Sequence, residues 1–171
     1  GISLTTAFLG FIYSISYTTA AVTLFMLALM PFLASLIAFI FLKEKISKQN
    51  FVSMVIAFIG TLVMIYASAF SGSFFGLIMG FVSSLGFAAF SVALRSKSDI
   101  KKFYILIYGG IFCALFSFIL MIINNQDFYI PIKNIYLSMT HGTLVASGLI
   151  LFSIGSKQLL SGELTMLSLL E

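Results

Sequence analysis

Apolar residues occupy seven long stretches of the chain, and the charged residues fall almost entirely in the short gaps between them. A helix needs about 20 apolar residues to cross the roughly 30 Å hydrocarbon core of a bilayer. Because the stretches are continuous and do not alternate with polar residues, they predict membrane-spanning helices rather than the strands of a barrel. The stretches long enough to span are 20–42, 51–69, 74–94, 103–123 and 135–154, and the incomplete ones are 2–17 and 159–171.

Composition supports the same fold class. The chain is 61% hydrophobic and 8% charged, whereas soluble domains carry about 25% charged residues. This composition excludes a water-soluble globular domain. We expect an all-α integral membrane protein that forms a polytopic helical bundle. The first stretch begins at Gly1 without a Met or a basic segment, so it does not resemble a signal peptide. Because the stretch at each end is incomplete, we expect the chain to be a fragment of a longer protein.

The basic residues are distributed asymmetrically. If the spans alternate in direction, every Lys and Arg except Lys133 falls on the same side of the membrane. Basic loops are retained in the cytoplasm, so we expect the loops at Lys43–Lys48 and Arg95–Lys102, with the turn at Lys157, to be cytoplasmic. The membrane would be the bacterial cytoplasmic membrane. The net charge of +4 therefore indicates topology and not a nucleic-acid partner.

The second stretch and the last one begin alike, which predicts an internal repeat. Residues 19–30 align with residues 160–171, each a small-residue turn that leads into a Leu- and Met-rich segment. The two lie five crossings apart, and an odd number of crossings inverts the orientation. Inverted five-span repeats are typical of transporters with a substrate site near the midplane. We therefore expect residues 1–69 to be the later three spans of one repeat, and residues 70–171 the first four spans of a second, with the last truncated.

Short motifs in both halves resemble those of a transporter family. The first half holds Ser16–Ala20, Met30-Pro31, Phe41–Ser47 and Gly60, and the second holds Gly76–Gly80, Val92–Arg95 and Leu160–Glu163. In this order and spacing they resemble an EamA-type member of the drug/metabolite transporter superfamily, over spans three to nine of ten. The resemblance implies a secondary transporter that exports a small organic metabolite, an amino acid or a related amphipathic compound, by alternating access.

Glu171 is the first candidate for a functional residue. About ten residues into its helix, at about 1.5 Å per residue, it would lie ~15 Å deep, near the midplane. An acid at that depth costs a few kcal/mol unless it faces a cavity or a partner. It is either a site for a coupling proton or a substrate amine, or a structural acid bonded to a neighbouring helix. Glu163 lies in the first turn of the same helix, where the positive end of the dipole favours an acid.

His141 is the single histidine and lies about one turn inside the sixth stretch. As a group that titrates near neutral pH it could relay a proton or bind substrate. A hydrogen-bonded histidine that packs near the outer interface is the favoured alternative. No second His or Cys lies near it in the sequence, so a metal site has no support, and we expect no cofactor.

The Met30-Pro31 pair lies inside the second stretch. Proline has no N–H to donate, so it can open the helix and leave a carbonyl free, although such a proline is also tolerated as a plain kink. The resemblance places this segment beside the central cavity. Tyr13, Ser84 and Phe87 are further candidates for the cavity wall. The alternatives remain open that Ser84 bonds back to its own helix and that Phe87 faces lipid.

Other polar and small residues are expected to be structural. Gly72, Gly76 and Gly80 recur every four residues and would let two helices approach closely. Glu44 can pair with Lys48 four residues later, and Ser47 can cap the next helix. Tyrosines at span ends are typical interface anchors, and they are Tyr17, Tyr66, Tyr104 and Tyr136.

A carrier is the leading function and a membrane-embedded, lipid-modifying enzyme is the alternative. Such an enzyme normally gathers acids, histidines or metal ligands at the membrane edge, and the chain has only five acids and one His. A scaffold protein would leave a midplane Glu171 unexplained. We therefore expect no enzyme. The partners would be the bilayer, a neutral, zwitterionic or cationic small molecule and a coupling proton.

Overall fold

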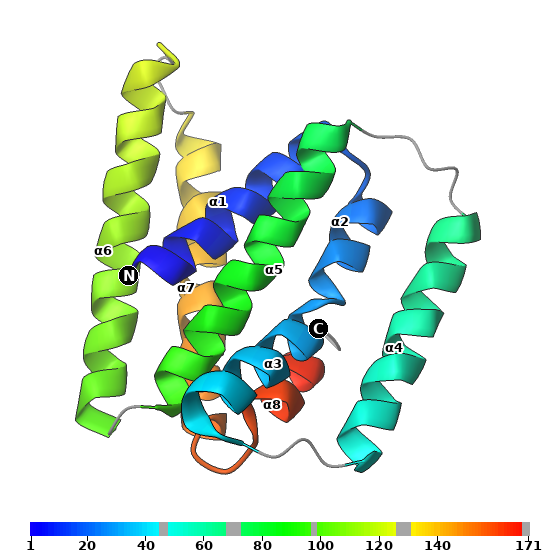
Figure 1. The fold of residues 1–171 in the computed structure, drawn as a ribbon. Coiled ribbons are helices and arrows are strands. Elements are labelled where there is room, and N and C mark those ends of the chain that lie inside the picture. The colour runs from blue at the N-terminus through cyan, green and yellow to red at the C-terminus, as the bar shows by residue number, and fades with distance from the viewer. Residues whose placement is uncertain (45–47, 68–72, 97–98, 126–130, 169–171) are drawn as a thin grey trace.

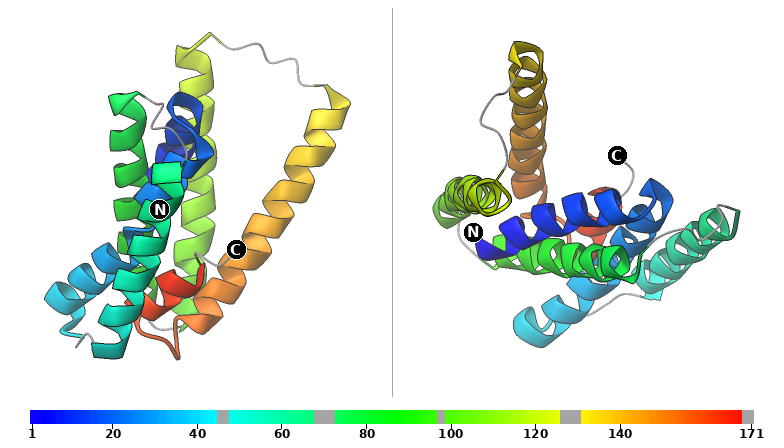
Figure 2. Two further views of the ribbon diagram at one scale, coloured as in Figure 1. Left: turned by 90° about the vertical axis from the view of Figure 1, so that its right-hand side faces the viewer. Right: turned by 90° about the horizontal axis from the view of Figure 1, so that it is seen from above.

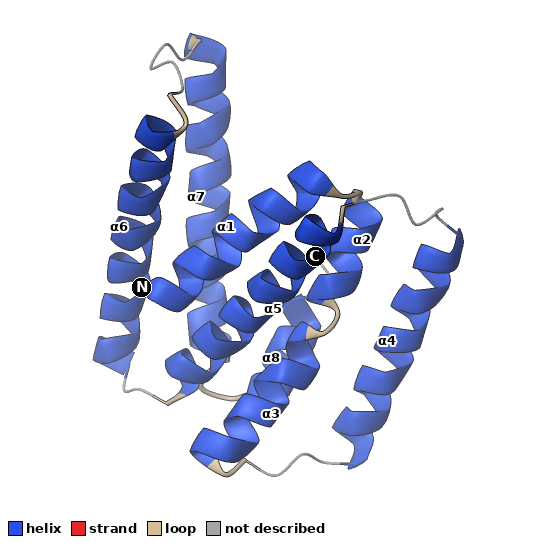
Figure 3. Ribbon diagram, turned by 45° about the horizontal axis from the view of Figure 1, so that its top comes forward, coloured by secondary structure: helices blue, strands red, loops and turns tan. Residues whose placement is uncertain are grey.

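A computed structural model describes the chain except for residues 45–47, 68–72, 97–98, 126–130 and 169–171. The described residues form helices and no strands (Figure 3), which confirms the all-α fold class. The predictions for Ser47, Gly72 and Glu171 concern residues outside the described ones. In chain order the helices are α1 (Ile2–Tyr17), α2 (Ala20–Leu27), α3 (Met30–Leu42), α4 (Lys48–Ala67), α5 (Phe74–Arg95), α6 (Asp99–Ile123), α7 (Ile132–Gly155) and α8 (Ser161–Leu167).

Four segments in the described part of the chain are long and apolar enough to cross a membrane. One of them is formed by α2 and α3 together, and α1 is apolar but shorter. The prediction of a multi-span membrane protein is therefore confirmed. The four segments are Ala20–Leu42, Phe74–Arg95, Phe103–Ile123 and Ile132–Gly155.

The second stretch is interrupted at the place where proline predicts an opening. Two turn residues, Ala28 and Leu29, separate α2 from α3, and Pro31 lies in the first turn of α3. Because proline has no N–H, the carbonyl of Leu27 lacks the donor that a continuing helix would supply at position 31. The stretch is thus divided into two helical segments at Ala28 and Leu29, whose backbones both keep right-handed helical angles.

The centre of the bundle is the pair formed by α1 and α5, which run side by side (Figure 1). Their backbones approach closely at glycines: a Cβ added to Gly10 would lie 2.8 Å from the carbonyl oxygen of Met79. A Cβ added to Gly86 would lie 2.7 Å from the amide nitrogen of Ala7. Small residues are what allow such approach in a membrane, where no hydrophobic effect drives helices together.

The glycines at the start of α5 pack as predicted. A Cβ added to Gly76 would lie 2.3 Å from a methyl carbon of Thr18, and one added to Gly80 would lie 2.8 Å from the Cβ of Met26. α8 approaches α3 by the same means, because a Cβ on Gly162 would lie 2.0 Å from the hydroxyl oxygen of Ser35. The glycines therefore act in helix packing.

The helix α7 stands apart from this central group (Figure 2), whereas α4 contacts it through the ring of Phe58, which meets those of Phe25 and Phe32. No described residue of α7 is buried, and residues 131–144 are all exposed. The exposed side chains are largely apolar, for example Leu144 and Leu151. In a bilayer such surfaces are covered by lipid or by other helices.

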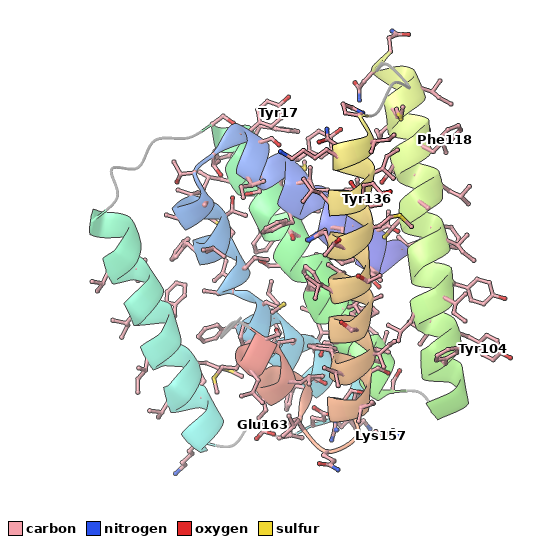
Figure 4. All side chains as sticks on the ribbon, turned by 180° about the vertical axis from the view of Figure 1, so that it is seen from behind. Tyr17, Tyr104, Phe118, Tyr136, Lys157 and Glu163 are labelled. Atoms are coloured by element: carbon pink, nitrogen blue, oxygen red, sulfur yellow. The ribbon has the colours of Figure 1, made fainter. Side chains whose placement is uncertain are left out.

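Apart from Lys133, the basic side chains that the structure describes gather at one end of the bundle. α3 and α5 end there and α4 begins there (Figure 1), which brings Lys43, Lys48 and Arg95 to the same side. Lys157 and Glu163 lie at that end and Tyr17 at the opposite one (Figure 4). This arrangement matches the alternating crossings that the sequence predicts.

Candidate functional site

A cavity of about 390 Å³ lies between the central helices and the α7–α8 segment. Its wall is mostly aromatic and aliphatic. Phe8 and Phe87 meet edge to face at a centroid distance of 5.6 Å, and Phe90 stacks on Phe152 at 6.2 Å. The lining residues are Phe8, Leu27, Met30, Phe87, Phe90, His141, Leu144, Val145, Gly148, Leu149, Phe152 and Ser168.

The interrupted helix reaches this cavity. Leu27 ends α2, Met30 begins α3, and both line the cavity. A helix break puts unpaired backbone groups at membrane depth, which is tolerated only where protein or a cavity surrounds them. The carbonyl of Leu27, which has no N–H at position 31 to accept from, therefore belongs to a residue that lines the cavity.

Three of the candidates from the sequence meet at the cavity, namely Met30, Phe87 and His141. Met30 comes from α3, Phe87 from the middle of α5 and His141 from α7. His141 is exposed and Ser168 is half-buried, and these are the two polar side chains among the lining residues. The polar groups are thus few and lie on the α7–α8 side.

The other described candidates lie elsewhere. Ser84 is buried, and its hydroxyl donates to the carbonyls of Met26 and Gly80, the second at 3.1 Å. Tyr13 belongs to an aromatic group at the end of α1, 6.4 Å from Tyr17 between ring centroids. Pro31 is buried in the first turn of α3 and is not among the lining residues.

The sequence did not single out several wall residues. On α7 they follow His141 at intervals of three and four, through Leu144, Gly148 and Phe152. That spacing keeps them on one helix face. Periodicity extended from His141 could have found this face, but nothing local distinguishes Phe8 and Phe90 from the lipid-facing Phe residues of the same chain.

A second polar cluster lies at the basic end of the bundle. The Nε of Arg95 donates to the Oε1 of Glu44, and its Nη1 donates to the carbonyls of Ser156, at 3.1 Å, and Leu159. The other carboxylate oxygen of Glu44 accepts from the amide of Ser161 at 3.3 Å. Two side chains therefore join the ends of α3, α5 and α7 to the start of α8.

This cluster corrects the expected pairing of Glu44 with Lys48. α3 ends at Leu42, and Lys43 then takes a left-handed conformation with a φ of 55°. The turn breaks the helical register on which an i,i+4 pair depends. Glu44 instead pairs with Arg95, 51 residues later. Glu163 behaves as expected, since its carboxylate accepts from the amide of Leu160 at 3.0 Å at the start of α8.

No group of three or more His, Cys, Asp or Glu side chains able to hold a metal ion occurs in the described part of the chain. Cys113 is half-buried on α6, where its thiol contacts the hydroxyl of Thr5 at 3.4 Å. It ties α6 to α1.

A helical bundle with an interrupted span at an apolar cavity is a transporter architecture. Residues 1–66 match the model of the EamA-like transporter family. These residues run from α1 through most of α4. The match agrees with the resemblance carried by the sequence motifs of the first half, and it covers less than half of the chain. No curated protein and no solved structure matches the chain.

Proposed function

We propose that the protein is a secondary carrier that moves a small organic solute through the cavity by alternating access. The observation that carries the proposal is the interrupted α2–α3 helix, whose ends Leu27 and Met30 both line the cavity. Discontinuous helices at a midplane site are a recurrent device of secondary transporters. The family match over residues 1–66 supports the same function.

The lining residues favour a substrate with an apolar or aromatic part. Four of them are phenylalanines, and the only polar side chains are His141 and Ser168. Ligand sites commonly combine an apolar wall with a few polar groups that fix orientation. An amino acid with an apolar side chain, or a related amphipathic compound, meets this description. A sugar phosphate is disfavoured, because none of the lining residues is a Lys or Arg.

We further propose export from the cytoplasm, with the basic end of the bundle inside. His141 is the described residue best placed to take part in proton coupling, since it is the one titratable side chain in the lining. For Glu171 we retain the proposal from the sequence that it binds a proton or a substrate amine. Glu171→Gln should then impair transport without preventing insertion. A single titratable side chain among the described lining residues gives the enzymatic alternative little support.

Solute counterflow in liposomes tests the proposal. The full-length protein is reconstituted in liposomes that are loaded with an unlabelled neutral amino acid. Uptake of the same amino acid in labelled form, added outside, is then followed. Phe87→Ala should lower uptake about tenfold, because it removes an aromatic wall that contacts the substrate. The matched control is Phe116→Ala, since Phe116 is exposed on α6. If amphipathic solutes show no counterflow, or if both variants lose the same activity, the proposed site is wrong.

A further inference from the structure

We propose that Glu44 and Arg95 form a gate that closes the cavity at the basic end of the bundle. This inference rests on the proposed transport function. It starts from the convergence of four segments, namely the ends of α3, α5 and α7 and the start of α8. Each is held to another by one of these two side chains.

The contacts reach across the expected repeat boundary. Glu44 belongs to the first repeat, and its carboxylate binds Arg95 and the amide of Ser161 in the second. Arg95 reaches on to the carbonyls of Ser156 and Leu159, which lie in the turn between α7 and α8. Alternating access requires the halves of a carrier to separate at one end at a time. Breaking these contacts would remove the polar links between α3 and the α5, α7 and α8 segments together.

The gate lies directly beyond the cavity. Phe90 and Phe152 are stacked in the cavity wall, on α5 and α7. Arg95 follows Phe90 by five residues, about 7.5 Å along the helix axis. Ser156 follows Phe152 by four residues and accepts from Arg95. A solute that left the cavity toward the basic end would have to part the segments that Arg95 joins.

The ion pair between Glu44 and Arg95 is placed where it can break and form again. The Arg95 and Glu44 side chains are 23% and 16% exposed, so water reaches both. The planar guanidinium fixes the direction of the contacts because it can donate to several acceptors at once. A lysine at position 95 would keep the positive charge but would lose the fixed, planar set of N–H donors. The contacts therefore favour one closed geometry without making it permanent.

The test measures access to the cavity and needs no substrate. A cysteine is introduced by Ser168→Cys, which replaces a cavity-lining side chain by one of similar size. All other cysteines of the full-length protein are replaced first, and Cys113 is replaced by alanine. A membrane-impermeant maleimide is then applied from each side to oriented vesicles. Labelling reports opening on that side even if the transported solute is unknown.

Glu44→Gln and Arg95→Gln should each raise labelling from the basic side about fivefold, because each removes the ion pair that favours the closed state. Arg95→Lys should give a smaller rise, and the double reversal Glu44→Arg with Arg95→Glu should restore part of the protection. Ser161→Ala is the matched control. Its hydroxyl is buried with no partner among the described residues, and the substitution keeps the backbone amide that binds Glu44.

Unchanged labelling in folded Glu44→Gln and Arg95→Gln proteins would overturn the gate and leave the pair as a structural contact. An equal rise from both sides would overturn it too, since that result reports general loosening. If the gate variants change labelling while no solute shows counterflow, the gate stands and the proposed substrate class fails. Melting temperatures of the same variants establish that the comparison is made between folded proteins.

Discussion

The α1–α5 pair and α7 form two very different walls of the same cavity. α1 and α5 meet at glycines where a single added methyl group would strike backbone atoms, and the hydroxyl of Ser83 donates to the carbonyl of Ala7 at 2.7 Å. α7 has no buried residue, and a Cβ added to Gly142 or Gly148 would meet nothing within 4 Å. The α1–α5 wall therefore has no room for an added methyl group at its glycines, whereas the α7 wall has free space at Gly142 and Gly148.

This difference indicates how the cavity can change shape. Interfaces packed backbone to backbone resist gradual deformation, because any shift produces overlap or loses contacts. α7 contacts the central helices near its C-terminal end, where the carbonyl of Ser156 accepts from Arg95 and Phe152 stacks on Phe90. We expect α1 and α5 to move as one body and α7 to move against them.

The largest effect is expected from Gly86→Ala. The added Cβ would lie 2.7 Å from the amide nitrogen and 3.0 Å from the Cα of Ala7, so the two helices must separate. Overpacking of this kind typically costs about 1–3 kcal/mol. The matched control is Gly110→Ala on α6, where nothing lies within 4 Å of the added Cβ. Denaturation of the purified protein in detergent measures both, and equal stability of the two variants would contradict the tight packing of α1 on α5.

A smaller effect is expected at the helix break, which lies where the packed wall meets the cavity. Pro31→Ala restores an N–H that can bond to the carbonyl of Leu27, and it would rejoin α2 and α3. We expect transport to fall about tenfold. Stability should not fall, since a helical hydrogen bond is gained. Counterflow and melting temperature are measured together. Transport at the wild-type rate would exclude the break from the mechanism.

The smallest effect distinguishes hydroxyls on the two walls. Ser83→Ala removes a buried bond between α5 and α1, and interhelical bonds in membranes contribute about 0.6 kcal/mol on average. Ser147→Ala on α7 removes only a local bond to the carbonyl of Leu144 and should leave stability unchanged. Chemical denaturation of both variants tests the difference. A larger loss at Ser147 would reverse the comparison.

Properties that depend on neighbouring residues could be predicted from the sequence. Apolar length locates the spans, and Pro31 marks the break because its missing N–H acts within one helical turn. The packing role of Gly76 and Gly80 follows from their spacing. The end of the second stretch at Leu42 was also predicted, because charged residues begin at Lys43.

Properties that depend on distant residues could not be predicted. Inside a membrane, a Phe facing lipid and a Phe facing a cavity have the same composition around them, so Phe90 and Phe152 gave no signal. Arg95 lies 51 residues from Glu44, and only the packing of α3 beside α5 brings them together. The partner of Ser84 is also distant in the sequence. Ser84 was expected to line the cavity, whereas its hydroxyl donates to the carbonyl of Met26.

The most direct test of these two walls is a set of distance distributions measured by electron paramagnetic resonance. Spin labels are placed on exposed residues of α1, α5 and α7, namely Ile12, Phe81 and Leu151. They are compared with and without a transported solute. We expect the α1–α5 distance to stay constant while both distances to α7 change. A change between α1 and α5 with α7 fixed would contradict the account.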